Sequence, residues 1–251
     1  MNKRVKWAAY NDLAWTELIV SSPEEYREET ELYCKIMINH SKTKPKTVLH
    51  LGCGAGINDY TFKKHFKVTG VDISNEMLKI ARELNPEVKY INGDMREIKL
   101  RTRFDAVTIP DSIGYMTNLK DLSKAINTAY LHLNNGGILL IVAHIRDNFR
   151  ENNFVYTGKK KDINITIFEN NYITNKTTYE ATLVYLIRRK KQLDIYTDKH
   201  TIGLFSLTSW NRILKENGFR IKKINSENTY ERFMLRDGHY PQVMFICRKI
   251  M

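Results

Sequence analysis

The 251-residue length fits one folded core with room for an inserted subdomain, and 42% hydrophobic with 27% charged residues exclude a disordered chain. The net charge of +12 would attract polyanions, but the basic residues are dispersed and are not interleaved with aromatics as in nucleic-acid-binding segments. The apolar run 138–143 is far shorter than the roughly 20 residues of a membrane span, and the N-terminus lacks a signal-type apolar stretch. We therefore expect a cytoplasmic protein without membrane contact.

The first predicted element is a helix over 23–40, with Ser22 as N-cap and Glu25 as the matching acid of a capping box. After it, segments typical of strands and helices alternate. They are predicted strands at 47–51, 67–72, 88–91, 104–109 and 137–143, and helices between the first two strands, over 75–84 behind Ser74, and over 119–133. This alternation is typical of a doubly wound parallel sheet.

From about residue 146 the pattern changes to antiparallel strands, predicted at 162–169, 178–187 and 193–205 with turns at Glu169-Asn-Asn and 189–192. A helix over 208–217, ended by Gly218, and strands at 219–224 and 242–248 follow. We predict an α/β fold with a seven-stranded, mostly parallel Rossmann-like sheet and helices on both faces. Its predicted parts are an N-terminal helical cap (1–46), the core (47–145 and 206–251) and an antiparallel β insertion on the substrate side (146–205).

A glycine-rich loop after the first predicted strand is the central chemical signal. In His50-Leu-Gly-Cys-Gly-Ala-Gly56, glycines permit a tight turn and a close approach of the backbone to a ligand. Asp72 ends the next strand and is suited to accept hydrogen bonds from both hydroxyls of a ribose. The dinucleotide pattern is not met, because Ile57 stands where its last glycine would be, and this argues against NAD. Asp94 and Met95, after the third strand, can hold an adenine.

In this order the segments 48–56, 70–78, 92–96, 104–107 and 133–138 resemble the class I S-adenosylmethionine-dependent methyltransferases over nearly the whole chain. The resemblance implies S-adenosyl-L-methionine as cofactor and S-adenosyl-L-homocysteine as product. The cofactor contacts that it implies come from the N-terminal segment, the glycine loop and the ends of the following strands: Tyr10, Trp15, Leu51, Gly52, Cys53, Gly54, Asp72, Ile73, Met77, Asp94, Met95 and Pro110.

Within this superfamily the chain is most similar to small-molecule N-methyltransferases of the nucleotide-amino-sugar and glycine type. The similarity lies in Tyr10-Asn-Asp-Leu-Ala-Trp15, in Asp111-Ser-Ile-Gly-Tyr115 and in the antiparallel insertion. In such enzymes the N-terminal tyrosine segment covers the sulfonium, so Tyr10 is the candidate for that role. A core aromatic that anchors the first helix is the alternative.

The expected reaction is methyl transfer to a small-molecule acceptor, at an amine nitrogen. Positioning supplies much of the catalysis, and an amine must also lose a proton before or during attack. The groups placed to accept it are Asp111, Tyr115, His144 and His200, each of which can instead be structural. Three arginines could hold an anionic acceptor such as a nucleotide diphosphate, or lie exposed: Arg146, Arg150 and Arg232.

Other functions remain as alternatives. An RNA (tRNA) methyltransferase would use the net positive charge, although the loop 109–112 lacks the Asn/Asp-Pro-Pro-Tyr/Phe pattern of amino-methylating nucleic-acid enzymes. A non-catalytic binding module would keep the fold alone. No metal site is expected, because Cys34, Cys53 and Cys247 lack paired spacing and no His/Cys/Asp cluster has metal-ligand spacing. Both a monomer and a homodimer remain open.

Overall fold

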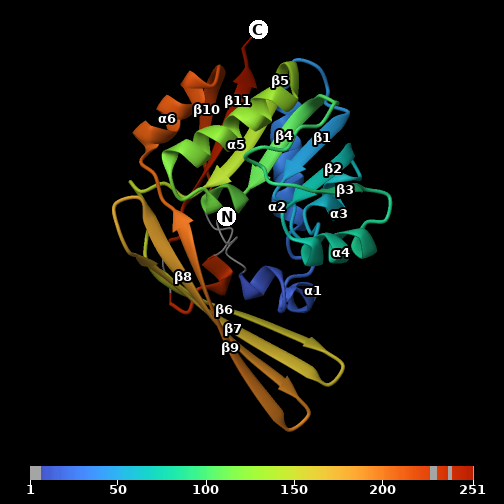
Figure 1. Ribbon diagram of the computed structural model, residues 1–251, viewed down its shortest axis with the longest axis vertical. Helices are drawn as coiled ribbons and strands as arrows, with labels where there is room; N and C mark the ends of the chain where they lie inside the picture. The colour runs from blue at the N-terminus through green and yellow to red at the C-terminus, as the bar shows by residue number, and fades with distance from the viewer. Residues whose placement is uncertain (1–6, 227–230, 237–238, 251) are drawn as a thin grey trace.

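The computed structural model describes residues 7–226, 231–236 and 239–250. This part of the chain forms two sheets (Figure 1). The larger sheet has seven strands, in the spatial order β10 (Phe219–Ser226), β11 (Gln242–Lys249), β5 (Leu133–Ala143), β4 (Phe104–Pro110), β1 (Thr47–Leu51), β2 (Lys67–Asp72) and β3 (Lys89–Asn92). Of these strands only β11 runs antiparallel to its neighbours. The predicted α/β fold class is confirmed.

Helices cover both faces of this sheet, because its central strands are apolar on both sides. In β5, Leu139 and Ile141 pack with α5 (Leu119–His132) and α6 (Leu207–Glu216) on one face. Leu140 and Val142 pack on the other face with residues of three helices: α2 (Arg27–His40), α3 (Asp59–Phe62) and α4 (Asn75–Leu84). Each such buried side chain stabilises the fold by about 1.5–3 kcal/mol, so this strand anchors the core.

The second sheet is a four-stranded antiparallel meander that lies between β5 and α6 in the chain. Its strands follow one another in space as in sequence: β6 (Asn152–Lys160), β7 (Ile163–Ile173), β8 (Thr178–Arg189) and β9 (Gln192–Gly203). Figure 1 shows the β6–β7 and β8–β9 hairpins extending away from the core. At the opposite end of the meander, the Arg146 N–H donates to the Phe205 carbonyl over 2.9 Å and so joins the two chain segments that enter and leave it.

The N-terminal segment lies between this meander and the glycine loop. It contains three short helical turns: η1 (Ala8–Tyr10), η2 (Ala14–Thr16) and α1 (Glu17–Val20). Leu13 and Val20 pack against strands of the meander, whereas Ala14 packs against Ala55 of the glycine loop. The segment therefore contacts both sides of the site at once. Residues 1–6, on which the expected cellular location partly rests, lie outside the described residues.

Three local expectations differ from the structure. The predicted turn at Glu169 is wrong, because this residue lies within β7, paired with Phe154 of β6 and Leu183 of β8. Strand β6 itself was not predicted. The first long helix begins at Arg27 and not at Pro23, although the Ser22–Glu25 hydrogen bonds of the expected capping box do form, at 2.9 and 3.4 Å, and close a turn. In the described part of the chain, no helix has the length and apolar character needed to cross a membrane.

Candidate active site

The glycine loop turns sharply at the carboxyl end of β1. Gly52 and Gly54 have φ of +73° and +53°, a conformation that L side chains rarely adopt. A Cβ on Gly52 would lie 2.2 Å from Ser112 Oγ, so this glycine is also required by close packing. A Cβ on Gly54 would meet nothing within 4 Å. The loop therefore leaves open space above Gly54, where a ligand can approach the backbone.

Asp72 connects the glycine loop to the next strand-to-helix turn. Its Oδ2 accepts the Gly54 N–H at 2.9 Å and its Oδ1 accepts the Ser74 N–H at 2.8 Å. Burial raises the pKa of this carboxyl group, and the two backbone hydrogen bonds oppose that rise. Each carboxylate oxygen retains acceptor capacity for a hydroxyl group. Asp72 is thus suited both to hold the loop and to bind a ribose.

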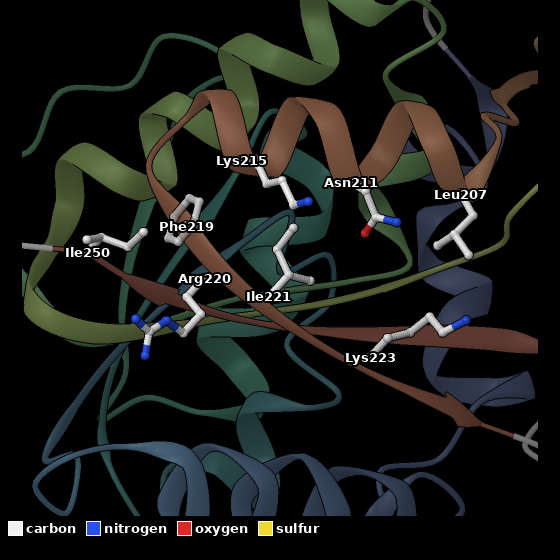
Figure 2. A pocket seen from close by; sticks show the side chains of 8 residues that line it. All are labelled: Leu207, Asn211, Lys215, Phe219, Arg220, Ile221, Lys223 and Ile250. Atoms are coloured by element: carbon white, nitrogen blue, oxygen red, sulfur yellow. The ribbon is translucent and has the colours of Figure 1, made fainter.

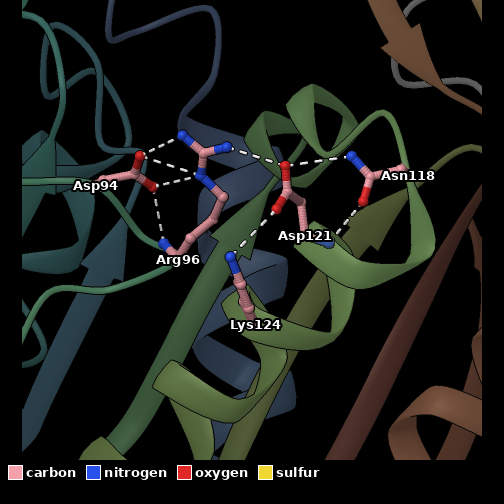
Figure 3. A network of polar contacts seen from close by, with 5 residues as sticks. All are labelled: Asp94, Arg96, Asn118, Asp121 and Lys124. Atoms are coloured by element: carbon pink, nitrogen blue, oxygen red, sulfur yellow. Dashed lines mark hydrogen bonds and ion pairs between the residues drawn. The ribbon is translucent and has the colours of Figure 1, made fainter. Parts of the chain in front are cut away.

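Asp94 is engaged in an ion pair in the structure (Figure 3). Arg96 donates to both of its carboxylate oxygens and also bridges to Asp121 of α5 at 3.0 Å. An adenine amino group would share this carboxylate with the guanidinium. Met95 extends toward Gly52, since its Cε would lie 2.9 Å from a Cβ placed there. The adenine contacts of Asp94 and Met95 stay predictions.

The other residues of the implied cofactor pocket differ in how accessible they are. Leu51 and Met77 are almost fully buried in the core, and their cofactor contacts stay predictions. Cys53 and Pro110 are buried as well, and burial raises the pKa of the Cys53 thiol well above its ordinary value. Ile73, in contrast, is 42% exposed beside Asp72 and can cover an apolar ligand face.

Tyr10 lies over this loop and contacts both halves of the site. Its carbonyl oxygen accepts the Ser74 hydroxyl at 2.5 Å, directly beside Asp72. Its own hydroxyl lies 2.5 Å from the Tyr115 hydroxyl. Trp15, five residues further on, packs under the Arg189 guanidinium at 5.0 Å. The position of Tyr10 fits the expected cover over the cofactor, while a cofactor contact of Trp15 stays a prediction.

The structure brings together two of the four candidate proton acceptors. Tyr115, at the end of η3 (Ser112–Tyr115), lies with its hydroxyl 2.8 Å from His200 Nδ1 on β9. Asp111 is held from the side of β11, where its Oδ1 accepts the Gln242 amide at 2.6 Å. Its φ of +55° is a strained backbone conformation for aspartate at the exit of β4.

His144 belongs to a different cluster, among the rings of Phe149, Tyr179 and Tyr240. Its Nδ1 lies 3.2 Å from the Pro241 carbonyl, which fixes this nitrogen as the donor. Burial lowers its pKa to about 4. It is therefore neutral at neutral pH and suited to accept a hydrogen bond at Nε2, but it is not part of the Tyr115–His200 pair.

Sequence reasoning missed Asp198 and several buried carboxylates. Asp198 Oδ2 lies 2.9 Å from His200 Nε2, and the signal was available, because residues two apart on a strand share a face. Burial raises the pKa of Glu17 and Glu29 to about 7. It also raises that of Glu169, whose carboxylate accepts the Tyr156 hydroxyl at 2.9 Å. No sequence motif marks these three glutamates.

The three arginines considered for an anionic acceptor all donate to backbone carbonyls. Arg146 bonds to Asn175 at 2.8 Å, Arg150 to Phe149 at 3.4 Å and Arg232 to Glu25 at 3.0 Å. A phosphate would have to compete for these donors. The anionic character of the acceptor stays a prediction.

Two further features lie apart from the glycine loop. Glu31, Cys34 and His65 bring their ligand atoms within 4.8 Å of one another, a grouping that sequence spacing did not reveal. His65 and Glu31 form an ion pair at 2.9 Å there. An open hollow of about 490 Å³ lies between α6 and β10. Lys215 and Lys223 are among the side chains that line it (Figure 2). Three strands separate β10 from β1, so this hollow is distinct from the candidate site.

Comparison with known proteins agrees with this geometry. A methyltransferase domain family matches residues 48–137. The chain is 27% identical over 192 residues to a protein of Bacillus subtilis named "Putative methyltransferase YqeM", a match that covers 72% of this chain and 76% of that protein. It is 26% identical over 206 residues to a dTDP-3-amino-3,6-dideoxy-alpha-D-glucopyranose N,N-dimethyltransferase of Streptomyces fradiae, and this match covers 79% of each chain.

Among solved structures, the S-adenosylmethionine-bound amino pentose methyltransferase CalS10 of Micromonospora echinaspora superimposes with a TM-score of 0.74. The superposition covers 98% of this chain and 99% of that one at 17% identity, so this likeness concerns the fold. The glycine loop, Asp72 and the order of strands in the sheet agree with the matching domain and the relatives in indicating a methyltransferase. Residues 48–137 match a methyltransferase domain, and the relatives over most of the chain support S-adenosylmethionine-dependent methyltransferase activity.

Proposed function

We propose that this enzyme transfers a methyl group from S-adenosylmethionine to the amine nitrogen of a small-molecule acceptor, with an amino sugar as the first candidate. The observation that carries the proposal is the position of Tyr10. It is hydrogen-bonded to Ser74 beside the glycine loop and to Tyr115. With His200, these two tyrosines form what we call the acceptor side of the site. Relatives named as amino-sugar N,N-dimethyltransferases support the same acceptor class.

The chain's own residues would bind and orient the two ligands. The open space above Gly54 and the acceptor capacity of Asp72 fit the adenosyl group. When bound, the cofactor supplies a methyl group activated by its sulfonium. The acceptor amine would approach from the side of Tyr10, Tyr115 and His200, where the N-terminal segment and the meander exclude water. In-line positioning of this kind can supply about 7–11 kcal/mol of the barrier.

We also keep four finer expectations as proposals: the three-part division of the chain, an anionic acceptor such as a nucleotide sugar, a cytoplasmic location, and a monomer or homodimer. The anionic acceptor has the least support from contacts, because the groups that act electrostatically on Tyr10 include three carboxylates. They belong to Glu17, Asp72 and Glu169.

The RNA alternative rests on one observation. The densest basic runs, 159–161 and 188–191, lie at the two hairpins that join β6 to β7 and β8 to β9. These hairpins project from the core (Figure 1). Binding of tRNA with an affinity that falls steeply with salt, together with methylation of that RNA, would favour this alternative.

The test begins with calorimetric titration of S-adenosylmethionine and S-adenosylhomocysteine, with NAD as the control ligand. We expect saturable binding of the first two alone. Acceptors are then screened by mass spectrometry for a gain of one or two methyl groups, beginning with dTDP-3-amino-3,6-dideoxy-α-D-glucopyranose and simple amines. Failure to bind either adenosyl ligand would contradict the proposed function.

A further inference from the structure

A continuous chain of hydrogen bonds runs from the Tyr10 hydroxyl into the meander. Tyr10 Oη lies 2.5 Å from Tyr115 Oη, and Tyr115 Oη lies 2.8 Å from His200 Nδ1. His200 Nε2 lies 2.9 Å from Asp198 Oδ2. The four residues come from three parts of the chain that are far apart in sequence, namely η1, η3 and β9. Only folding brings them into one line.

The chemistry of the last link fixes the direction of the whole chain. An ionised carboxylate can only accept, so His200 carries its proton on Nε2 and donates it to Asp198. The unprotonated Nδ1 therefore accepts the Tyr115 hydroxyl. The Tyr115 oxygen is then the acceptor for the Tyr10 hydroxyl. As a result, Tyr10 presents oxygen lone pairs, and not its proton, to a group that approaches from the acceptor side.

Resting on the proposed amine methylation, we propose that Tyr10, Tyr115 and His200 form a proton relay for the acceptor ammonium, and that Asp198 is the positioning residue that orients its terminal base. The N–H bond of the acceptor breaks, and its electron pair remains on the nitrogen that attacks the methyl group. An O–H bond forms at Tyr10, the Tyr10 proton moves to Tyr115, and the Tyr115 proton moves to His200 Nδ1. One proton is transferred, and the imidazolium that results lies beside the Asp198 carboxylate.

The two tyrosines act here as carriers and not as bases. Burial raises the pKa of both Tyr10 and Tyr115 far above the ordinary value, so neither is a tyrosinate at neutral pH. Burial lowers the pKa of His200, and Asp198 opposes this by stabilising the charged ring. His200 is therefore neutral at neutral pH, so its Nδ1 keeps the lone pair that accepts the Tyr115 proton. Other groups that act electrostatically on Tyr10 or Tyr115 include Glu17, Asp72, Glu169 and Tyr179. Tyr10 and Asp198 in turn help to raise the pKa of Tyr185.

Asp198 also links the relay to the N-terminal segment. Its Oδ2 accepts the Ala9 N–H at 2.8 Å, in addition to His200. The Trp7 ring packs on Tyr115 and on His200, with centroid distances of 4.7 and 5.4 Å. The relay is therefore complete only when the N-terminal segment is packed against Tyr115, His200 and Asp198. Deprotonation of the acceptor thus depends on this segment closing the site.

The first experiment reads the relay without an acceptor. The protein labelled with ¹⁵N-histidine is examined by NMR in the presence of S-adenosylhomocysteine, and His200→Gln assigns the His200 signals. We expect a neutral ring with its proton on Nε2 at pH 7, and a changed Nδ1 shift in Tyr115→Phe. A proton on Nδ1, or an imidazolium at pH 7, would overturn the relay whatever the acceptor is.

The second experiment uses an amine acceptor found in the screen. We expect Tyr115→Phe and Asp198→Asn to lower kcat by about 100-fold, within the range of general acid–base catalysis, with S-adenosylhomocysteine affinity within twofold of wild type. Asp198→Asn should also move the acidic limb of the kcat profile to lower pH, because it removes the group that raises the pKa of His200. The amide oxygen introduced by this substitution can still accept the Ala9 N–H, so folding should be preserved.

The matched control is Asp194→Asn, the same change on the same strand, where the carboxylate pairs at 2.9 Å with Arg189 outside the relay. It should leave kcat and the pH profile unchanged. If kcat falls in Asp198→Asn while the acidic limb of its pH profile stays where it is in wild type, Asp198 has only a structural role. That result would overturn the relay. If the wild-type protein binds neither adenosyl ligand, the proposed function is contradicted. If the Tyr115→Phe or Asp198→Asn variant methylates the amine as well as wild type does, the relay alone is contradicted.

Discussion

The cofactor side and the acceptor side of the site are built in different ways. On the cofactor side, the loop after β1 and the turn after β2 lie within about one βαβ unit, and Asp72 bonds across only 18 residues to Gly54. On the acceptor side, Tyr10 meets Tyr115 across 105 residues and Tyr115 meets His200 across 85. The proposed methyl-donor site is thus built by local sequence, and the proposed acceptor site is built by the tertiary fold.

The largest expected effect is on the cofactor side, at Gly54. In Gly54→Ala, a methyl group would enter the space left for the ligand, and the positive φ would cost about 1–2 kcal/mol. We expect the affinity for S-adenosylhomocysteine, measured by calorimetry, to fall by at least 100-fold. Gly136→Ala is the control, since Gly136 also has a positive φ but has only Lys42 near its Cβ position. Equal losses in both variants would mean that strain, and not ligand space, explains the effect.

Tyr10→Phe should separate the two sides. It removes the outer hydroxyl of the relay but keeps the backbone bond from Ser74. We expect kcat to fall by about 100-fold while affinity for S-adenosylhomocysteine changes by less than twofold. Steady-state kinetics and calorimetry on the same preparation check both numbers. A large loss of cofactor affinity would instead assign Tyr10 to the cofactor side.

Asp72→Ala should act on the cofactor side alone. The loss of hydrogen bonds to a charged group, about 1.5–3 kcal/mol, should weaken S-adenosylmethionine binding by at least tenfold. Calorimetry checks the affinity, and thermal unfolding checks that the loop anchored by this carboxylate at Gly54 and Ser74 still folds. Unchanged affinity would remove Asp72 from the cofactor site.

The smallest expected effect concerns the stability of the fold, at Glu29 of α2. Burial raises the pKa of Glu29 from 4.5 to about 7 in the folded protein, so between these values the folded state binds more protons than the unfolded one. Stability should therefore fall as pH rises through this window. Because solvent still reaches part of the Glu29 side chain, the loss is expected to be only about 1–2 kcal/mol. Denaturant unfolding on the two sides of this window should give a smaller difference for Glu29→Gln than for wild type.

The same contrast explains how much could be predicted from the sequence. Strands such as 47–51 and 67–72 were predicted with their observed bounds, because apolar runs between turn-forming residues carry a local signal. Ser74 and Gly218 were correctly identified at helix ends for the same reason. Strand β6 was missed because its residues, including Lys159 and Lys160, are mostly polar. Its only neighbouring strand in the sheet is β7, apart from an isolated bridge between Phe154 and Met234.

Among the candidate site residues, the loop around Gly54 and Asp72 was recognisable from spacing alone. Tyr115 and His200 were named as separate candidates, but nothing in the local pattern relates residues 85 positions apart. Asp198 was overlooked because an acidic residue on an exposed-looking strand resembles ordinary surface charge. Its role is recognised only in the structure, where Asp198 Oδ2 accepts hydrogen bonds from both His200 and the Ala9 N–H.

The bond between the Arg146 N–H and the Phe205 carbonyl has a consequence for how such a protein can diversify. This bond and the one from the Leu207 N–H to Asp147 Oδ2 hold the segments that enter and leave the meander together. Lengthening its hairpins therefore adds closure entropy only logarithmically. The seven-stranded sheet, with the loop that we propose binds the methyl donor, need not change when the hairpins do. An enzyme built in this way can change its acceptor by replacing the meander, while the core that carries the proposed methyl-donor site stays the same.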